Sequence, residues 1–294
     1  MNCEEEKNKR LAEVVAFVNN SQLSSIKAVV SGIINIINDP KSRVKDLKDI
    51  IELDPPLTSK VLKWSNSAYY GSSTKISDIE KAVIWIGFDA LKELALSQKV
   101  CEIFDKDEYI HGYSRILSWK HSIAVALLGK MIYRREFGQA GKSVYVAGLL
   151  HDIGIIVEDQ FLQEDFKNIL LKVKDEKKNL SKAEDEVFGY NHAELGKALI
   201  EDWGLPQELV IAIGHHDYPI ENNEFSRITS TIFISEYVCR EIGYGDAPFT
   251  DERFFNKHLK ELNIEPHALD LIIKDMKSEI LEMEDKGLFA SEKN

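Results

Sequence analysis

The chain has 294 residues, a formal net charge of −12 and an apolar fraction of 44%, which is ordinary for a globular protein with one large or two small domains. It contains no apolar run near the roughly 20 residues that a membrane-spanning helix needs, and its charged first ten residues do not resemble a secretory signal. We therefore expect a cytoplasmic protein without membrane contact, and an acidic chain that repels a phosphate backbone is not expected to bind nucleic acid directly.

The negative charge is spread unevenly along the chain. Residues 1–100 carry a net charge of +1 and the remainder carries −13, which suggests two separate units. The cysteines Cys3, Cys101 and Cys239 are far apart and form no CxxC pair. This spacing indicates reduced thiols and excludes a zinc ribbon or a disulfide framework.

The first part of the chain reads as helix. Hydrophobic periodicity predicts helices at residues 24–37, 43–53, 55–68, 77–87 and 88–104. Asp54 before Pro55 has the pattern of an N-cap followed by a first-turn proline, and Ser77 with Glu80 has capping-box spacing. Four aromatic residues are expected to pack between these helices, with a docking or stacking surface as the alternative: Trp64, Tyr69, Tyr70 and Trp85.

A polar stretch at residues 105–112 predicts a junction between two parts. We assign residues 1–108 to an N-terminal helical module and residues 109–294 to a second helical domain with a C-terminal helical extension. In the second part, helices are expected at residues 112–136, 142–152, 161–175, 192–203, 206–214, 226–242 and 266–284. No segment alternates with the period of a strand, so the predicted fold class is all-α, a multi-helical array.

Five of the eight histidines fall on apolar helices or at their ends. They are His121, His151, His192, His215 and His216, and Asp152 directly follows His151. His121 shares a helical face with core residues, while Gly148 would let a neighbouring helix approach the segment that ends at His151. Imidazoles and a carboxylate on successive helices suit a site for iron, manganese or zinc. A single inward histidine is more often a hydrogen-bonded core residue, so the prediction rests on the five together.

Longer motifs identify a resemblance. The segments "IIELDPPLTSKVLKWSNSAYYG", "ISDIEKAVIWIGFDALKELALS", "WKHS", "AGLLHDIG" and "HAELGKALIEDWGLPQELVIAIGHH" together resemble the HDOD family, and the histidine spacing resembles the HD-GYP branch of the HD metal-dependent phosphohydrolases. This resemblance implies an all-helical, bacterial, cytoplasmic signalling protein whose second part is an HD-like domain. Most HDOD proteins have lost the metal ligands and act as interaction modules, whereas this chain contains the histidines.

Carried over residue by residue, the resemblance implies a set of metal ligands. His121, His151, Asp152, His192, His215 and His216 match the ligand positions of the HD-GYP pattern. Its last ligand, an aspartate on a later helix, corresponds to Glu236, for which a solvated helix glutamate is the alternative. The lysine of the "HDxGK" pattern is replaced by Ile155, and "DYPIENNEF" follows His216 where a "GYP" loop would stand.

These observations predict a signalling or regulatory HDOD protein that has kept a binuclear His/Asp metal site, with weak or no catalysis. The expected cofactor is a divalent transition metal, iron first, with manganese or zinc as alternatives. Asp152 would bridge the metals and is the candidate catalytic residue. The expected partner is a signalling protein or a phosphorylated small molecule. Two alternatives stay open: an active metal-dependent phosphohydrolase acting on a nucleotide or cyclic dinucleotide, and a sensor in which redox or oxygen changes act at an iron pair.

Overall fold

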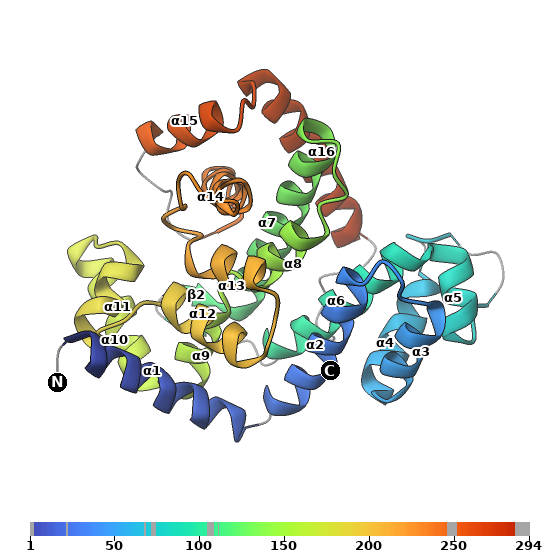
Figure 1. Cartoon of the computed structure of the whole chain (residues 1–294), viewed down its shortest axis with the longest axis horizontal. Helices are drawn as coiled ribbons and strands as arrows, with labels where there is room; N and C mark the ends of the chain where they lie inside the picture. The colour runs from blue at the N-terminus through green and yellow to red at the C-terminus, as the bar shows by residue number, and fades with distance from the viewer. Residues whose placement is uncertain are drawn as a thin grey trace. The chain divides into compact units, whose positions relative to one another are not determined.

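The computed structural model describes residues 3–21, 23–67, 69–71, 75–104, 109–110, 112–245 and 252–285. The chain divides into two compact units, one formed by Met1–Ser24 with Lys106–Ile272 and the other by Ser25–Asp105 with Ile273–Asn294 (Figure 1). Within the described residues the regular structure is helical, apart from a short antiparallel pair of strands, β1 (Tyr109–Ile110) and β2 (Tyr113–Ser114). The predicted all-α class is confirmed.

The unit built around residues 25–105 contains the helices of the predicted N-terminal module. They are α2 (Leu23–Asn38), α3 (Val44–Glu52), α4 (Pro55–Ser65), α5 (Ile79–Ile86), α6 (Phe88–Cys101) and a 3-10 turn, η1 (Glu102–Phe104). The Asp54 carboxylate accepts a hydrogen bond from the Leu57 amide at 3.0 Å, which confirms its prediction as the N-cap of α4. The prediction of Ser77 as the cap of α5 is wrong, because the neighbouring Asp78 carboxylate accepts from the Lys81 amide at 2.8 Å.

The four aromatic residues of this unit differ in exposure. Trp64, Tyr69 and Tyr70 are half-buried, in agreement with packing between helices. Trp85 is 48% exposed, and its indole nitrogen donates a hydrogen bond to the Tyr70 carbonyl at 2.8 Å. The alternative of a docking surface therefore stays open for Trp85.

The larger unit contains most of the remaining helices. They are α1 (Cys3–Asn19), α7 (Arg115–Glu136), α8 (Lys142–Leu150), α9 (Ile153–Phe161), α10 (Gln163–Glu176), α11 (Leu180–Phe188), α12 (His192–Asp202), α13 (Gln207–Gly214), α14 (Ser226–Glu241) and α15 (Glu252–Glu261), and α16 (Pro266–Asp285) begins in it. Helix α7 packs on α8 and α14, and α12 packs on α9 and α13. The sequence did not predict α1, α9, α11 or α15 as separate helices.

Two glycines allow unusually close helix packing in this unit. A Cβ atom on Gly148 of α8 would lie 2.5 Å from Cα of Ala126 on α7, so the predicted close approach at Gly148 is confirmed. A Cβ atom on Gly154 of α9 would lie only 2.0 Å from the carbonyl oxygen of His192 at the start of α12. Because side chains are absent at both points, backbone meets backbone, and the segments that carry the predicted ligands come together.

The two units do not coincide with the two predicted domains at every point. Helix α1 belongs to the same unit as α7 to α15, and the end of α16 belongs to the unit of α2 to α6. Of the predicted junction at 105–112, residues 105–108 and 111 lie outside the described residues. The assignment of residues 1–108 and 109–294 to separate domains stays a prediction.

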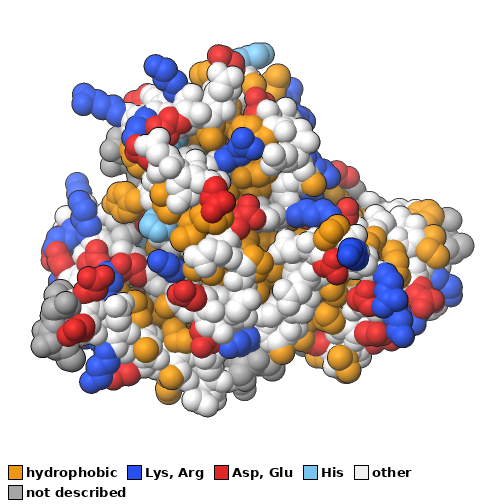
Figure 2. All heavy atoms as spheres, viewed as in Figure 1, with side chains coloured by type: hydrophobic (Ala, Val, Ile, Leu, Met, Phe, Trp, Pro, Cys, Tyr) orange, Lys and Arg blue, Asp and Glu red, His pale blue; other side chains and the backbone are white. Residues whose placement is uncertain are grey.

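Two features of the structure bear on the charge and the hydropathy of the chain. On the face viewed in Figure 2, acidic side chains lie among basic and hydrophobic ones rather than in one continuous patch. None of the described helices is both long enough and apolar enough to cross a membrane.

Candidate metal centre

Four of the predicted histidines meet inside the larger unit. His121 lies in the second turn of α7, His151 directly follows α8, His192 is the first residue of α12, and His216 lies two residues beyond α13. All four are buried, with at most 4% of the residue exposed. Their Nε2 atoms converge on the carboxylate of Asp152, which lies between α8 and α9 and is 5% exposed.

The other ring nitrogen of each histidine is held by a hydrogen-bond acceptor. Nδ1 of His121 lies 2.5 Å from the Tyr244 carbonyl oxygen, and Nδ1 of His151 lies 2.8 Å from that of Gly148. Nδ1 of His216 lies 2.7 Å from the Ile213 carbonyl oxygen, and Nδ1 of His192 lies 2.7 Å from the Glu184 carboxylate. Since carbonyl and carboxylate oxygens can only accept, each Nδ1 carries the hydrogen. In the neutral tautomer each Nε2 then presents a lone pair, which is the arrangement that orients histidine ligands of metals.

The converging atoms form two groups that share Asp152. His121, His151 and Asp152 make up one group and Asp152, His192 and His216 the other, with the potential ligand atoms of each group within 4.8 Å of one another. Oδ2 of Asp152 lies 3.2 Å from His151 Nε2 and 3.7 Å from His121 Nε2, while Oδ1 lies 3.6 Å from His216 Nε2 and 3.8 Å from His192 Nε2. One oxygen of Asp152 therefore faces each pair of imidazoles.

Glu236 on α14 completes the first group. Its Oε2 atom lies 2.6 Å from His121 Nε2 and 3.2 Å from His151 Nε2, while Oε1 accepts a hydrogen bond from Arg240. Glu236 is only 1% exposed, so the alternative of a solvated helix glutamate is wrong.

Asp217 takes the corresponding place at the second group, and the sequence reasoning missed it. Its carboxylate oxygens lie 3.8 Å from His192 Nε2 and 3.8 Å from His216 Nε2, and the Ser181 hydroxyl donates a hydrogen bond to it at 2.7 Å. The residue is 6% exposed. The signal that could have found it is its position directly after the His215–His216 pair.

His215 lies apart from both groups. It is half-buried, and among the described residues it belongs to neither set of potential ligands. Burial lowers the pKa of its imidazole, and the nearby Lys197 lowers it further. The adjacent His216 is the member of the pair that turns inward, and the ligand role of His215 stays a prediction.

The charges of the centre balance one another through protons in the metal-free protein. Burial disfavours the charged form of each ring, but Asp152 raises the pKa of His151, and Glu184 raises the pKa of His192 to about 9. Burial also disfavours the charged carboxylates, yet His151 holds the pKa of Asp152 below its ordinary value, and Arg240 does so for Glu236. Protons on two imidazoles thus compensate the buried acidic groups.

The donor set fits divalent metal. Nε2 of His121 and of His151, Oδ1 of Asp152 and Oε2 of Glu236 are buried and make no hydrogen bond of good geometry with any described residue. Nε2 of His192 and Nε2 of His216 face each other at 3.2 Å. Two lone pairs so placed need a cation or a proton between or beside them, and imidazole with carboxylate oxygen is a set that divalent iron, manganese and zinc accept.

The motifs that surround these ligands match a family model. The HDOD domain model matches residues 23–219, which is more than half of the chain. The chain belongs to the HDOD family. The resemblance stated from the sequence motifs is confirmed.

Solved HDOD-like structures share the fold. An HDOD domain protein of unknown function from Geobacter sulfurreducens is 26% identical, with 97% of this chain and 99% of that chain covered and a TM-score of 0.76. A "Putative signal transduction protein" from Marinobacter aquaeolei is 19% identical, with 98% and 66% covered and a TM-score of 0.77. A "Putative phosphohydrolase" from Shewanella amazonensis is 20% identical, with 94% and 97% covered and a TM-score of 0.71. The last two show the fold alone.

A relative among curated proteins is longer than this HDOD chain. An "Uncharacterized protein" of Treponema pallidum is 25% identical over 216 residues, which are 72% of this chain and 41% of the relative. The chain therefore spans less than half the length of the curated relative it matches.

Ile155 lies where the resemblance to the HD-GYP pattern implies a lysine. It lies on α9, three residues after Asp152, and is 6% exposed. A buried aliphatic side chain provides neither a charge nor a hydrogen bond. The cationic Arg240 near the ligands is already engaged by Glu236. The HDOD protein thus has the potential metal ligands without the lysine of the catalytic pattern.

Proposed function

We propose that this HDOD protein is a signalling or regulatory module that binds two divalent transition-metal ions. Its ligands are His121, His151, Asp152, His192 and His216, with Glu236 and Asp217 at the two ends of the site. The single observation that carries this proposal is the position of Asp152, whose two oxygens each face one pair of buried imidazoles. A carboxylate so placed can bridge two ions.

The protein groups around the centre have defined tasks in this proposal. The acceptors at each Nδ1 fix the ring orientation and the tautomer, so little reorganisation is needed for binding. Arg240 compensates the charge of Glu236 and keeps its carboxylate ionised. When bound, a divalent metal pair supplies positive charge that can lower the pKa of a water molecule and neutralise phosphoryl oxygens.

Weak or absent catalysis is part of the proposal. A phosphodiester bound at the centre would meet Ile155 where a lysine would stabilise the developing charge. Loss of one such electrostatic contact costs roughly 2.7–4 kcal/mol, or a factor of roughly 100 to 1,000 in rate. The module would then act by binding a signalling partner rather than by turnover.

The metal is proposed to be iron, with manganese or zinc as the alternatives. Nitrogen and carboxylate donors accept all three, so ligand chemistry alone does not choose among them. Cys239 is buried, and burial raises the pKa of its thiol, which makes it a poor source of thiolate. We therefore propose no thiolate ligand.

An active metal-dependent phosphohydrolase is the second candidate function. It is favoured by the buried imidazoles and carboxylates that meet at Asp152, which an interaction module without metal does not require. Its substrate would be a nucleotide or cyclic dinucleotide. A third outcome, bound iron without turnover but with a redox-dependent spectrum, would identify a sensor.

The test is elemental analysis of the full chain purified without added metal. We expect about two metal ions per chain in the wild type and none in a His151→Ala, Asp152→Ala double variant that retains its helical circular dichroism. The matched control is His267→Ala, which changes an exposed histidine on α16 and should keep full metal content. Full metal content in the double variant would place the site elsewhere. Hydrolysis of a cyclic dinucleotide by the metal-loaded wild type would favour the enzyme.

A further inference from the structure

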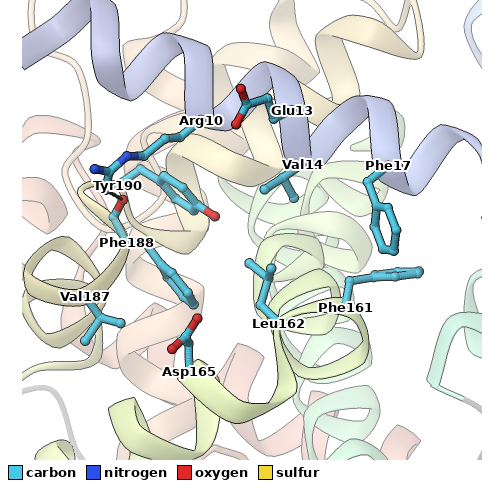
Figure 3. A pocket seen from close by; sticks show the side chains of 10 residues that line it. All are labelled: Arg10, Glu13, Val14, Phe17, Phe161, Leu162, Asp165, Val187, Phe188 and Tyr190. Atoms are coloured by element: carbon cyan, nitrogen blue, oxygen red, sulfur yellow. Dashed lines mark hydrogen bonds between the residues drawn. The ribbon is translucent and has the colours of Figure 1, made fainter.

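A hollow of about 480 Å³ lies between α1, the α9–α10 connection and the end of α11 (Figure 3). All of these elements belong to the larger unit. Its volume falls in the range of about 300–1,000 Å³ that is typical of small-molecule sites. None of the proposed metal ligands lines it.

Aromatic rings form two sides of the hollow. Phe17 of α1 and Phe161 of α9 meet edge to face at 5.7 Å, while Phe188 and Tyr190 stack at 5.3 Å with an interplanar angle of 11°. Figure 3 shows the two pairs on opposite sides of the space. Phe17 is 60% exposed, which is unusual for so large an apolar side chain. Ring faces carry partial negative charge and attract cations.

The Asp165 carboxylate of α10 supplies negative charge to this space, and it forms no ion pair within the described part of the chain. Glu13 of α1 also lines the hollow, but its exposed carboxylate forms an ion pair with Lys9 at 3.8 Å. Arg10 also lines it, but its guanidinium donates to Glu6 at 2.9 Å and to the carbonyl of Phe188 at 3.0 Å. With the arginine engaged in this way, the hollow favours a positively charged occupant.

The hydroxyl of Tyr190 is the strongest indication of a ligand. The residue is 98% buried, and in Figure 3 its oxygen points into the hollow. That oxygen forms no hydrogen bond with any residue that the structure describes. A phenol hydroxyl can both donate and accept a hydrogen bond. This oxygen is therefore available to a ligand that enters the hollow.

We propose that this hollow is a binding site for a small organic cation with an apolar body, such as an arylalkylammonium. The ring pairs would hold the apolar part and lie against the cation, Asp165 would neutralise its charge, and the Tyr190 oxygen would accept a hydrogen bond from it. An anion would face the Asp165 carboxylate, which disfavours anionic ligands.

The hollow is well placed to influence the metal centre. Tyr190 lies two residues before His192, and Phe161 ends the helix that begins directly after Asp152. A bound cation could therefore act as an input to the signalling module. That consequence rests on the proposed function, whereas binding itself does not depend on metal.

The test is isothermal titration of the full chain with three probes of similar shape. They are the cation phenethylammonium, the neutral 2-phenylethanol and the anion 3-phenylpropionate. We expect phenethylammonium to bind with a Kd of about 1 mM or tighter, about tenfold tighter than the alcohol, and the anion not to bind. This measurement does not depend on metal content. The cation site can therefore be refuted while the proposed metal centre is supported, and the metal centre can be refuted while cation binding is supported.

Variants locate the binding. Tyr190→Phe keeps the ring and should weaken phenethylammonium binding roughly two- to tenfold, and Asp165→Asn should weaken it roughly two- to fivefold. The matched control is Asp175→Asn, which changes an exposed aspartate of the same helix outside the hollow and should leave binding unchanged. Absence of phenethylammonium binding, equal affinity for the alcohol, or equal effects of the two aspartate variants would overturn the proposal.

Discussion

Replacement of Gly154 by alanine tests how the metal centre is assembled. The added Cβ would lie 2.0 Å from the His192 carbonyl oxygen, 2.7 Å from its carbonyl carbon and 2.8 Å from its Cα. Ordinary van der Waals contact begins at 3.4 Å, so α9 and α12 must move apart by about 1.4 Å at this point. The clash is with backbone, and no side chain can turn away to relieve it.

The expected cost lies at the upper end of what overpacking usually produces. Overpacked core substitutions destabilise by about 1–3 kcal/mol, and alanine recovers at most about 1 kcal/mol through its higher helix propensity. A net loss of about 2–3 kcal/mol corresponds to a fall in Tm of about 4–12 °C in a unit of this size. The displacement also separates Asp152 from His192, so we expect reduced metal content in the folded variant.

Gly196→Ala on α12 provides the matched control. Its Cβ would first meet Cγ2 of Ile213 at 3.1 Å, a side-chain methyl group that can shift by a few tenths of an ångström. We expect a Tm within about 4 °C of the wild type and unchanged metal content. Thermal unfolding followed by circular dichroism and elemental analysis measure both quantities. A Gly154→Ala variant with the Tm and metal content of the wild type would refute this account of the packing.

Three further predictions concern the centre itself. We expect Asp217→Asn to lower the metal content and His215→Ala to leave it unchanged, as measured by elemental analysis. Loss of metal in His215→Ala with full metal content in Asp217→Asn would instead identify His215 as the ligand. Ile155→Lys should raise cyclic-dinucleotide hydrolysis of the metal-loaded protein, whereas brisk turnover by the wild type would contradict weak catalysis. Burial opposes the charge on His192, but Glu184 outweighs it and raises the pKa from 6.5 to about 9. Protonation therefore stabilises the metal-free fold fully below about pH 6.5, and this contribution is lost as the pH rises through about 9. Metal must displace that proton, so titrations should show affinity that increases between these pH values, and a pH-independent affinity would contradict the assignment.

Local signals in the sequence predicted much of the helical fold. The Asp54–Pro55 start was correct because an N-cap acts through the next three residues alone. Helix α9 was missed because its apolar residues follow α8 after only two residues, His151 and Asp152, and periodicity does not mark so short an interruption. The break matters functionally, since it is where Asp152 turns its carboxylate between the two groups of imidazoles.

The candidate ligands were predictable from the sequence as a set, but the direction in which each side chain points and its hydrogen-bond acceptor were not. The motif spacing indicated His121, His151, Asp152 and His192, which the structure brings together. Beyond the end of α13, helical periodicity no longer indicates which way a side chain points, so His215 and His216 could not be told apart. Gly148 and Ile213 lie three residues before the histidines whose Nδ1 atoms they hold. The acceptor for His121 is Tyr244, which lies 123 residues away, so only the tertiary fold places it.

The buried charges explain how a module with little catalysis could still change state. Unpaired carboxylates inside a protein are costly, so Asp152, Asp217 and Glu236 need compensating positive charge in every condition. In the metal-free protein this charge comes from Arg240 and from protons on His151 and His192. Under the proposed function, metal would replace those protons at the ends of α8 and α12. Metal supply and pH would then act on the same helix ends, and a partner that contacts those helices could respond to either without any phosphodiester being cleaved.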